Sequence, residues 1–78
     1  MTMTTEEKHA RLQEIFREAL DLPDLRLTED FSVADCPAWD SVATVQIVLA
    51  TEAAFNVRVP TEKVATLHRA GDLLALLP

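Results

Sequence analysis

One serine stands where the sequence could support chemistry at the start of a helix. Ser41 follows Asp40 and precedes Val42, and residues 42–55 contain neither glycine nor proline. A helix beginning at Ser41 would leave its first amides unpaired and carry a partial positive charge at that end. A phosphate ester on Ser41 would be stabilised there. The same serine could instead serve only as a helix cap, worth about 1 kcal/mol, and the residues alone favour this simpler interpretation.

The other reactive side chains form no recognisable catalytic or metal-binding motif. The residue types of a nucleophilic triad are present at Ser41, Asp40, His9 and His68. No Gly-x-Ser-x-Gly sequence surrounds the serine, and a single glycine cannot build an oxyanion or phosphate-binding loop. Cys36 is interpreted as a small buried hydrophobic residue, and one cysteine with two scattered histidines does not match a zinc site. The sequence therefore predicts no catalytic residue and no metal ligand.

Length and composition predict one small domain, residues 1–78, with an aliphatic core. The chain has 78 residues, of which 49% are hydrophobic and 5% aromatic, with one cysteine and no tyrosine. A lone cysteine cannot form an internal disulfide, so hydrophobic packing must stabilise the fold. An interior this small has little room for the buried cleft of a typical enzyme.

Acidic residues are concentrated in one part of the chain. The net charge is −6, which disfavours binding to nucleic acid. Residues 21–40 hold six acidic residues and one basic residue, together with Pro23 and Pro37, which break helices. This stretch is predicted to be a long acidic loop, either simply solvated or guiding basic partners at short range.

The sequence also predicts a cytoplasmic protein without a membrane partner. The longest apolar run, Leu73–Pro78, has six residues, whereas a membrane-spanning helix needs about 20. The first residues have neither the positive flank nor the apolar stretch of a secretory signal. A single unpaired thiol suits a reducing compartment.

Two long helices are predicted, one on each side of the acidic loop. Thr4 and Glu7 match a capping box, and apolar residues then recur at steps of three and four as far as Leu20. The second helix is predicted over residues 41–55, with an N-cap from the Asp-Ser pair at its start and with Asn56 at its end. Its buried stripe is predicted to comprise Val45, Val48, Leu49, Ala53 and Phe55.

Two further helices complete the predicted fold. Thr61 is expected to cap a short third helix that carries Val64 and Leu67. A last helix is expected to run to the C-terminus, with Asp72 near its start, where the helix dipole favours an anion. Its apolar residues are Leu73, Leu74, Leu76 and Leu77. The predicted fold is all-α: a four-helix bundle of three longer helices plus one short helix, with a long loop between the first and second helices.

The segment around Ser41 resembles the acyl carrier protein family. The hallmark of that family is Asp-Ser-Leu at the opening of the second helix, and here Asp40-Ser41-Val42 stands in its place. The helix then closes on Glu52-x-x-Phe55, and an apolar segment leads to Pro60. The order of the helices, the length and the acidity extend the resemblance over essentially the whole chain.

This resemblance implies that Ser41 is the attachment point of phosphopantetheine, transferred from coenzyme A by a phosphopantetheinyl transferase. The chain would then be a carrier rather than an enzyme, holding acyl groups as thioesters on the thiol of that arm. Asp40 would orient the arm, Val42 and Leu49 would contact partners, and Glu52 would be an acidic contact. The other implied partners are a loading ligase or acyltransferase and a downstream synthase or transferase. A monomer is expected.

The second helix departs from the pattern of carriers that serve fatty-acid synthesis, which usually bear several acids there. The matching positions are Ala43, Gln46, Ala53 and Ala54, which leaves Glu52 alone. We infer a specialised free-standing carrier of a polyketide or lipid-related pathway. Two alternatives stay open: an aminoacyl or peptidyl carrier loaded by an adenylating ligase, and an unmodified helical interaction module in which Ser41 only caps the helix.

Overall fold

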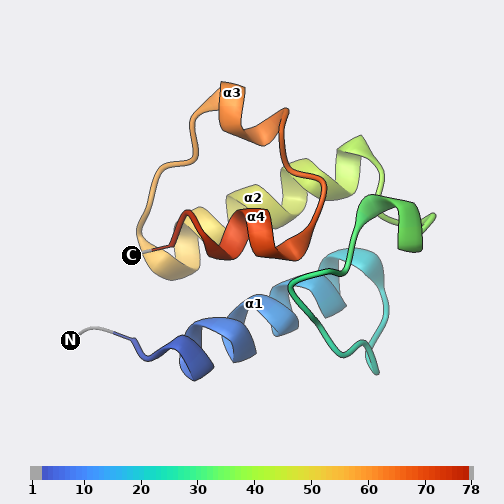
Figure 1. Cartoon of the computed structure of the whole chain (residues 1–78), viewed down its shortest axis with the longest axis horizontal. Coiled ribbons are helices and arrows are strands. Elements are labelled where there is room, and N and C mark those ends of the chain that lie inside the picture. The colour runs from blue at the N-terminus through green and yellow to red at the C-terminus, as the bar shows by residue number, and fades with distance from the viewer. Residues whose placement is uncertain (1–2, 78) are drawn as a thin grey trace.

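The computed structural model describes residues 3–77, which form four α-helices and one short 3-10 turn. The long helices are α1 (Thr5–Leu20) and α2 (Ser41–Phe55), and the short ones are α3 (Thr61–Val64) and α4 (Ala70–Leu74). The 3-10 turn, η1 (Val33–Asp35), lies in the long loop that joins α1 to α2 (Figure 1). The predicted all-α, four-helix fold with a long loop after the first helix is confirmed.

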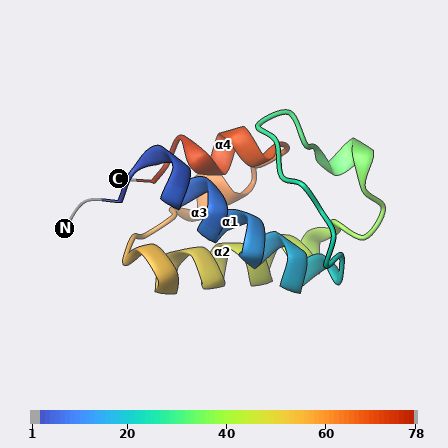
Figure 2. The same cartoon turned by 90° about the horizontal axis from the view of Figure 1, so that it is seen from below.

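The helices pack around α1. It contacts both α2 and α4, while α3 packs on α2. Figure 2 shows α2 and α4 on opposite sides of α1 in that view. No helix within residues 3–77 is long and apolar enough to cross a membrane.

Helix α1 forms as its capping signals predict. Thr4 Oγ1 accepts a hydrogen bond from the Glu7 amide, and Glu7 Oε1 accepts one from the Thr4 amide, both at 3.1 Å. The helix ends where Asp21 adopts a left-handed conformation, with φ 55°. Aspartate tolerates this region better than most residues, so the helix already ends two residues before Pro23.

The last two helices differ from the prediction: α3 has another cap, and α4 is shorter. Thr61 is the first residue of α3, and Pro60 occupies the cap position without a side-chain hydrogen bond. Helix α4 stops at Leu74, because the amides of Leu76 and Leu77 donate to carbonyls three residues back and so form tighter turns. Only two helices are therefore long. Pro78, the end of the predicted last helix, lies outside the described residues.

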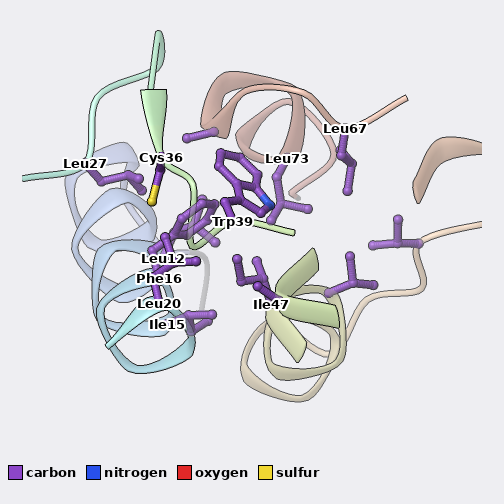
Figure 3. Packing of buried hydrophobic residues seen from close by; sticks show 14 of the residues in the cluster. Leu12, Ile15, Phe16, Leu20, Leu27, Cys36, Trp39, Ile47, Leu67 and Leu73 are labelled. Atoms are coloured by element: carbon purple, nitrogen blue, oxygen red, sulfur yellow. The ribbon is translucent and has the colours of Figure 1, made fainter. Parts of the chain in front are cut away.

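Aromatic rings lie at the centre of the core, which the prediction of an aliphatic core did not include. Phe16 of α1, Phe31 of the loop and Trp39 form one cluster, in which the Phe16 and Trp39 rings meet edge to face at 5.0 Å. Aliphatic residues pack with Phe16 and Trp39 in the buried cluster (Figure 3), and the partly buried Phe31 packs against it. Cys36 is buried beside them, as predicted.

The buried face of α2 differs from the predicted stripe. Val48 and Phe55 are buried as predicted, whereas Val45, Leu49 and Ala53 are exposed. The residues of α2 that face the core are Ala43, Ile47, Val48, Thr51 and Phe55. Because this helix is apolar on nearly every side, its periodicity cannot select the face that packs against α1.

Three side chains on one stripe of α1 hold the first half of the loop. Gln13 Oε1 accepts from the Leu27 amide at 2.9 Å, and Arg17 Nε donates to the Leu25 carbonyl oxygen at 2.7 Å. His9 Nε2 donates to the carbonyl oxygen of Leu27. With its backbone groups paired in this way, Leu27 is buried at 2% exposure.

The second half of the loop pairs with the segment that leads into α4. Three backbone hydrogen bonds, each 2.9 Å long, join the two segments. The Val33 amide donates to the carbonyl oxygen of His68. The amides of Ala70 and Gly71 donate to the carbonyl oxygens of Phe31 and Glu29, respectively. A Cβ atom on Gly71 would lie 3.0 Å from the Glu29 carbonyl oxygen, so a larger residue would push the Glu29 backbone away by a few tenths of an ångström.

Asp72 lies in the first turn of α4, as the sequence predicts, and its carboxylate binds the backbone just before the helix. Its Oδ2 accepts from the amides of His68 and Arg69, both at 3.1 Å. These bonds, that of His68 first, together with the Arg69 guanidinium, hold the pKa of Asp72 below its ordinary value of 3.8 against the opposing effect of desolvation. Arg69 also reaches Asp30 of the loop at 3.6 Å.

We expect the charge on Asp72 to stabilise the fold above about pH 4 and to lose this effect as the pH falls. A carboxyl whose pKa is lower in the folded state binds its proton more readily when unfolded, so acid favours unfolding. Thermal unfolding between pH 6 and pH 2.5 measures the effect. Asp72→Asn should show a smaller loss on acidification than the wild type. Asp24→Asn, at an exposed loop position, should keep the wild-type loss; equal curves for all three proteins would refute the assignment.

Candidate functional site

Ser41 is the first residue of α2, and its side chain is exposed. It lies where the long loop enters α2, at the same end of the molecule as the C-terminus of α1 (Figures 1 and 2). The acidic residues of the loop that precede it, Asp35 and Asp40, are exposed as well. The hydroxyl that the sequence singled out is therefore accessible from solvent.

Asp40, and not Ser41, caps the helix. Asp40 Oδ1 accepts a hydrogen bond from the Ala43 amide at 2.8 Å, and the Asp40 carbonyl oxygen accepts the first helical bond from the Thr44 amide at 2.9 Å. The interpretation of Ser41 as the cap is therefore wrong. Its hydroxyl makes no hydrogen bond within residues 3–77 and is free for other chemistry.

The start of α2 suits a phosphate ester on Ser41. Of the first amides of this 15-residue helix, that of Ala43 is used by Asp40, while those of Ser41 and Val42 have no acceptor within residues 3–77. Two free amides and the partial positive charge of the helix end would stabilise phosphate oxygens on the neighbouring hydroxyl. The residues present therefore fit phosphopantetheine joined to Ser41.

An uncharged apolar stripe runs along α2 from Ser41. Val42, Val45 and Leu49 are 65%, 51% and 60% exposed, and their spacing puts them on one side of the helix. Val42 and Leu49 are thus accessible, as a partner contact requires. Val45 was placed in the core by the sequence, and its position between the other two adds it to the stripe.

Acidic side chains contribute little to the outer face of α2. Glu52 is half-buried, and its Oε2 accepts from the Val59 amide at 2.8 Å, which ties the end of α2 to the segment before Pro60. Three of the positions where acids are absent, Gln46, Ala53 and Ala54, are exposed. Ala43 is buried at 5% exposure, so this position belongs to the core and could not present an acid to a partner.

The remaining reactive residues do not gather around Ser41. His9 binds the loop carbonyl of Leu27, His68 lies before α4, and Cys36 is buried. Within residues 3–77 no group of three or more histidine, cysteine or acidic side chains could hold a metal ion. An open cavity of about 550 Å³ is lined by the start of α1, the loop around Asp30 and α4, with no residue from α2.

Comparison with known proteins identifies the same kind of site. Residues 10–77 match the family model described as "Phosphopantetheine attachment site". The acyl carrier protein of Rhodococcus erythropolis is 35% identical over 77 residues, covering 99% of this chain and 85% of the relative. The meromycolate extension acyl carrier protein of Mycolicibacterium smegmatis is 34% identical over 77 residues, covering 99% of this chain and 78% of the relative.

A solved structure has the same fold. The solution structure of a holo acyl carrier protein from Geobacter metallireducens superposes with a TM-score of 0.79 at 28% sequence identity. The match covers 88% of this chain and 79% of that protein.

Removing the Asp40 side chain should destabilise the protein, whereas removing the Ser41 hydroxyl should not. Asp40→Ala leaves the Ala43 amide without its acceptor and should lower the free energy of unfolding by about 1 kcal/mol. Asp40→Asn retains an acceptor and should lose much less. Ser41→Ala should stay within about 0.5 kcal/mol of the wild type. Chemical denaturation measures all three, and a larger loss for Ser41→Ala than for Asp40→Ala would contradict the assignment of the cap.

Proposed function

This chain belongs to the acyl carrier protein family, and we propose that its phosphopantetheine is attached to the hydroxyl of Ser41. The observation that carries the proposal is that Asp40 provides the helix cap, which leaves an exposed and unbonded hydroxyl beside two free amides. As a member of this family the chain is a carrier and not an enzyme. The alternative was an unmodified module in which Ser41 only caps the helix, and the cap from Asp40 speaks against that role of Ser41.

Each residue at the start of α2 has a distinct part in this function. When bound, phosphopantetheine supplies a thiol on which an acyl group is held as a thioester. Ser41 anchors the arm, and the amides of Ser41 and Val42 offset the charge of its phosphate. Asp40 fixes the first turn and so holds the anchoring residue in place. Tethering raises the effective concentration of the acyl group at each enzyme that the carrier meets.

The partners that we propose follow from the family and from the outer face of α2. A phosphopantetheinyl transferase would modify Ser41, a ligase or acyltransferase would load the arm, and a synthase or transferase would use the acyl group. Val42, Val45 and Leu49 provide an apolar contact for such partners, with Asp40 at its edge. Glu52 is a weaker candidate for an acidic contact, since its carboxylate already accepts a bond from Val59.

A specialised lipid-related pathway is the context that we propose for this carrier. Relatives named as meromycolate extension carriers, and an α2 face without acids, support this proposal. The relatives reported above are named as acyl carriers, which favours acyl over aminoacyl cargo. A single domain over residues 1–78, a monomeric state, a cytoplasmic location and the absence of a nucleic-acid partner stay predictions of the sequence.

The attachment site is tested by mass spectrometry of the protein after incubation with coenzyme A and a broad-specificity phosphopantetheinyl transferase. The wild type should gain the mass of one phosphopantetheine, and Ser41→Ala should gain none. Ser32→Ala is the matched control, because Ser32 is the other serine of the chain and also precedes a helical turn. It should be modified like the wild type. Modification of Ser41→Ala, or an unmodified wild type when other carriers are loaded, would disprove the proposal.

Shortening Leu49 should weaken the docking of the transferase. Because Leu49 is 60% exposed, its replacement should cost the fold little, and Leu49→Ala should raise the KM for the carrier on the order of fivefold. Leu22→Ala removes the same atoms from an exposed leucine outside α2 and should leave the KM unchanged. Steady-state kinetics of the modification measure both, and equal KM values for the two variants would count against the apolar stripe as the contact.

A further inference from the structure

Trp39, two residues before Ser41, is buried although it lies in a loop. Its side chain is 3% exposed. The ring packs edge-on against Phe16 of α1, at 5.0 Å and 90°, and lies nearly parallel to Phe31 of the loop, at 5.7 Å and 14°. In Figure 3 the indole lies at the centre of the cluster, between Phe16 and Leu73 of α4. The segment that enters α2 is therefore anchored to α1, to the loop and to α4.

The polar edge of the same ring is tied to the first turn of α2. Trp39 Nε1–H donates to Thr44 Oγ1 at 2.9 Å, and the Thr44 hydroxyl donates to the Asp40 carbonyl oxygen at 3.0 Å. The Thr44 amide donates to that oxygen too, at 2.9 Å. We call these three residues, Trp39, Asp40 and Thr44, the bracket. It joins the residues just before Ser41 to the turn just after it.

The bracket holds the backbone that carries the Ser41 side chain. This backbone sets the direction of the Ser41 Cα–Cβ bond, and the hydroxyl, which has no hydrogen bond within residues 3–77, turns only about that bond. That backbone is held at residue 40 by the cap and the Thr44 hydroxyl, and at residue 39 by the buried indole. This order should raise the rate of a reaction at the hydroxyl, because a nucleophile that is already held in place loses less conformational freedom in the transition state.

We propose that the hydrogen bond between Trp39 and Thr44 positions the Ser41 hydroxyl for the transfer of phosphopantetheine onto it. The proposal rests on Ser41 being the attachment site. In this transfer the Ser41 Oγ–phosphorus bond forms at the diphosphate phosphorus on the pantetheine side of coenzyme A, and the bond from that phosphorus to the bridging oxygen breaks. Adenosine bisphosphate leaves, and the serine proton passes to a base of the transferase. Trp39 and Thr44 touch none of the reacting atoms, so they are positioning residues.

Two variants remove this hydrogen bond. Trp39→Phe retains an aromatic ring without the N–H donor but leaves part of the buried space of the indole empty. Thr44→Val retains the shape of threonine without the hydroxyl. With coenzyme A and a broad-specificity transferase, each should lower kcat about threefold to tenfold, the effect of one lost hydrogen bond. The KM for the carrier should change little, because the apolar stripe on α2 is intact. Thr44→Ser restores the hydroxyl and should restore kcat.

The double variant tests whether the two residues act as one unit. Both variants delete the bond between Trp39 and Thr44, and Thr44→Val also deletes the bond from the Thr44 hydroxyl to the Asp40 carbonyl oxygen. The double variant should therefore be no slower than Thr44→Val alone. Exchange of the indole N–H, followed by NMR, should be faster in Thr44→Val than in the wild type. This second readout reports on the bond itself and does not depend on the transferase.

Thr51→Val is the matched control for a purely structural effect. Thr51 lies on the same helix, is fully buried, and its hydroxyl donates to the Ile47 carbonyl oxygen at 2.7 Å. Its replacement should lower the melting temperature without changing kcat at a temperature where every variant is folded. An equal loss of kcat in Thr51→Val and Thr44→Val would overturn the proposal.

The remaining outcomes are also decisive. Faster indole exchange in Thr44→Val with an unchanged kcat would overturn the proposal, and so would unchanged exchange. If Trp39→Phe does not fold, the comparison of Thr44→Val with Thr44→Ser suffices. Failure of the attachment site itself would be seen separately, as modification of Ser41→Ala, whereas failure of the positioning leaves wild-type modification at Ser41 intact.

Discussion

The hydrogen bond from the Ala43 amide to the Asp40 carboxylate is the interaction on which the site depends. Serine and aspartate compete for the cap of a helix that begins at such a pair, and here the aspartate takes it. As a result the serine becomes the first helical residue, with its hydroxyl in solvent and two free amides beside it. The attachment that we propose at Ser41 therefore depends on which of two neighbouring residues accepts the hydrogen bond of one amide.

The long loop can place that helix start because its own backbone groups are paired at both ends. Gln13 and Arg17 of α1 bind the backbone around Leu27, and the segment before α4 binds the backbone around Phe31. Buried backbone groups need partners, and a chain without a disulfide must obtain order from such contacts. Between the two attachments, Phe31 stacks on Trp39, so the order of the loop extends to the residues just before Ser41.

Helix α2 serves the core and the outer surface at the same time. Ile47 and Thr51 face the interior, while Val42 and Leu49 face solvent without a charged residue among them. Glu52, the acidic residue of this helix, accepts a bond from the Val59 amide at its far end. The outer face of α2 is consequently apolar, and the negative charge of this end of the molecule comes from the loop.

The sequence by itself determined the start of α1 and both ends of α2, and it predicted Ser41 as the reactive residue, because the signals for each lie a few positions apart. Thr4 with Glu7, Asp40 before Ser41, and Asn56 in a left-handed turn all act within one turn of backbone. Tertiary structure alone decided which face of α2 is buried, since an apolar helix offers no preference until α1 packs against it. It also decided that the indole of Trp39 reaches Thr44, and that Gln13 and Arg17 bind the loop. Local sequence patterns do not predict these contacts, because the partners of each side chain come close only when the chain folds.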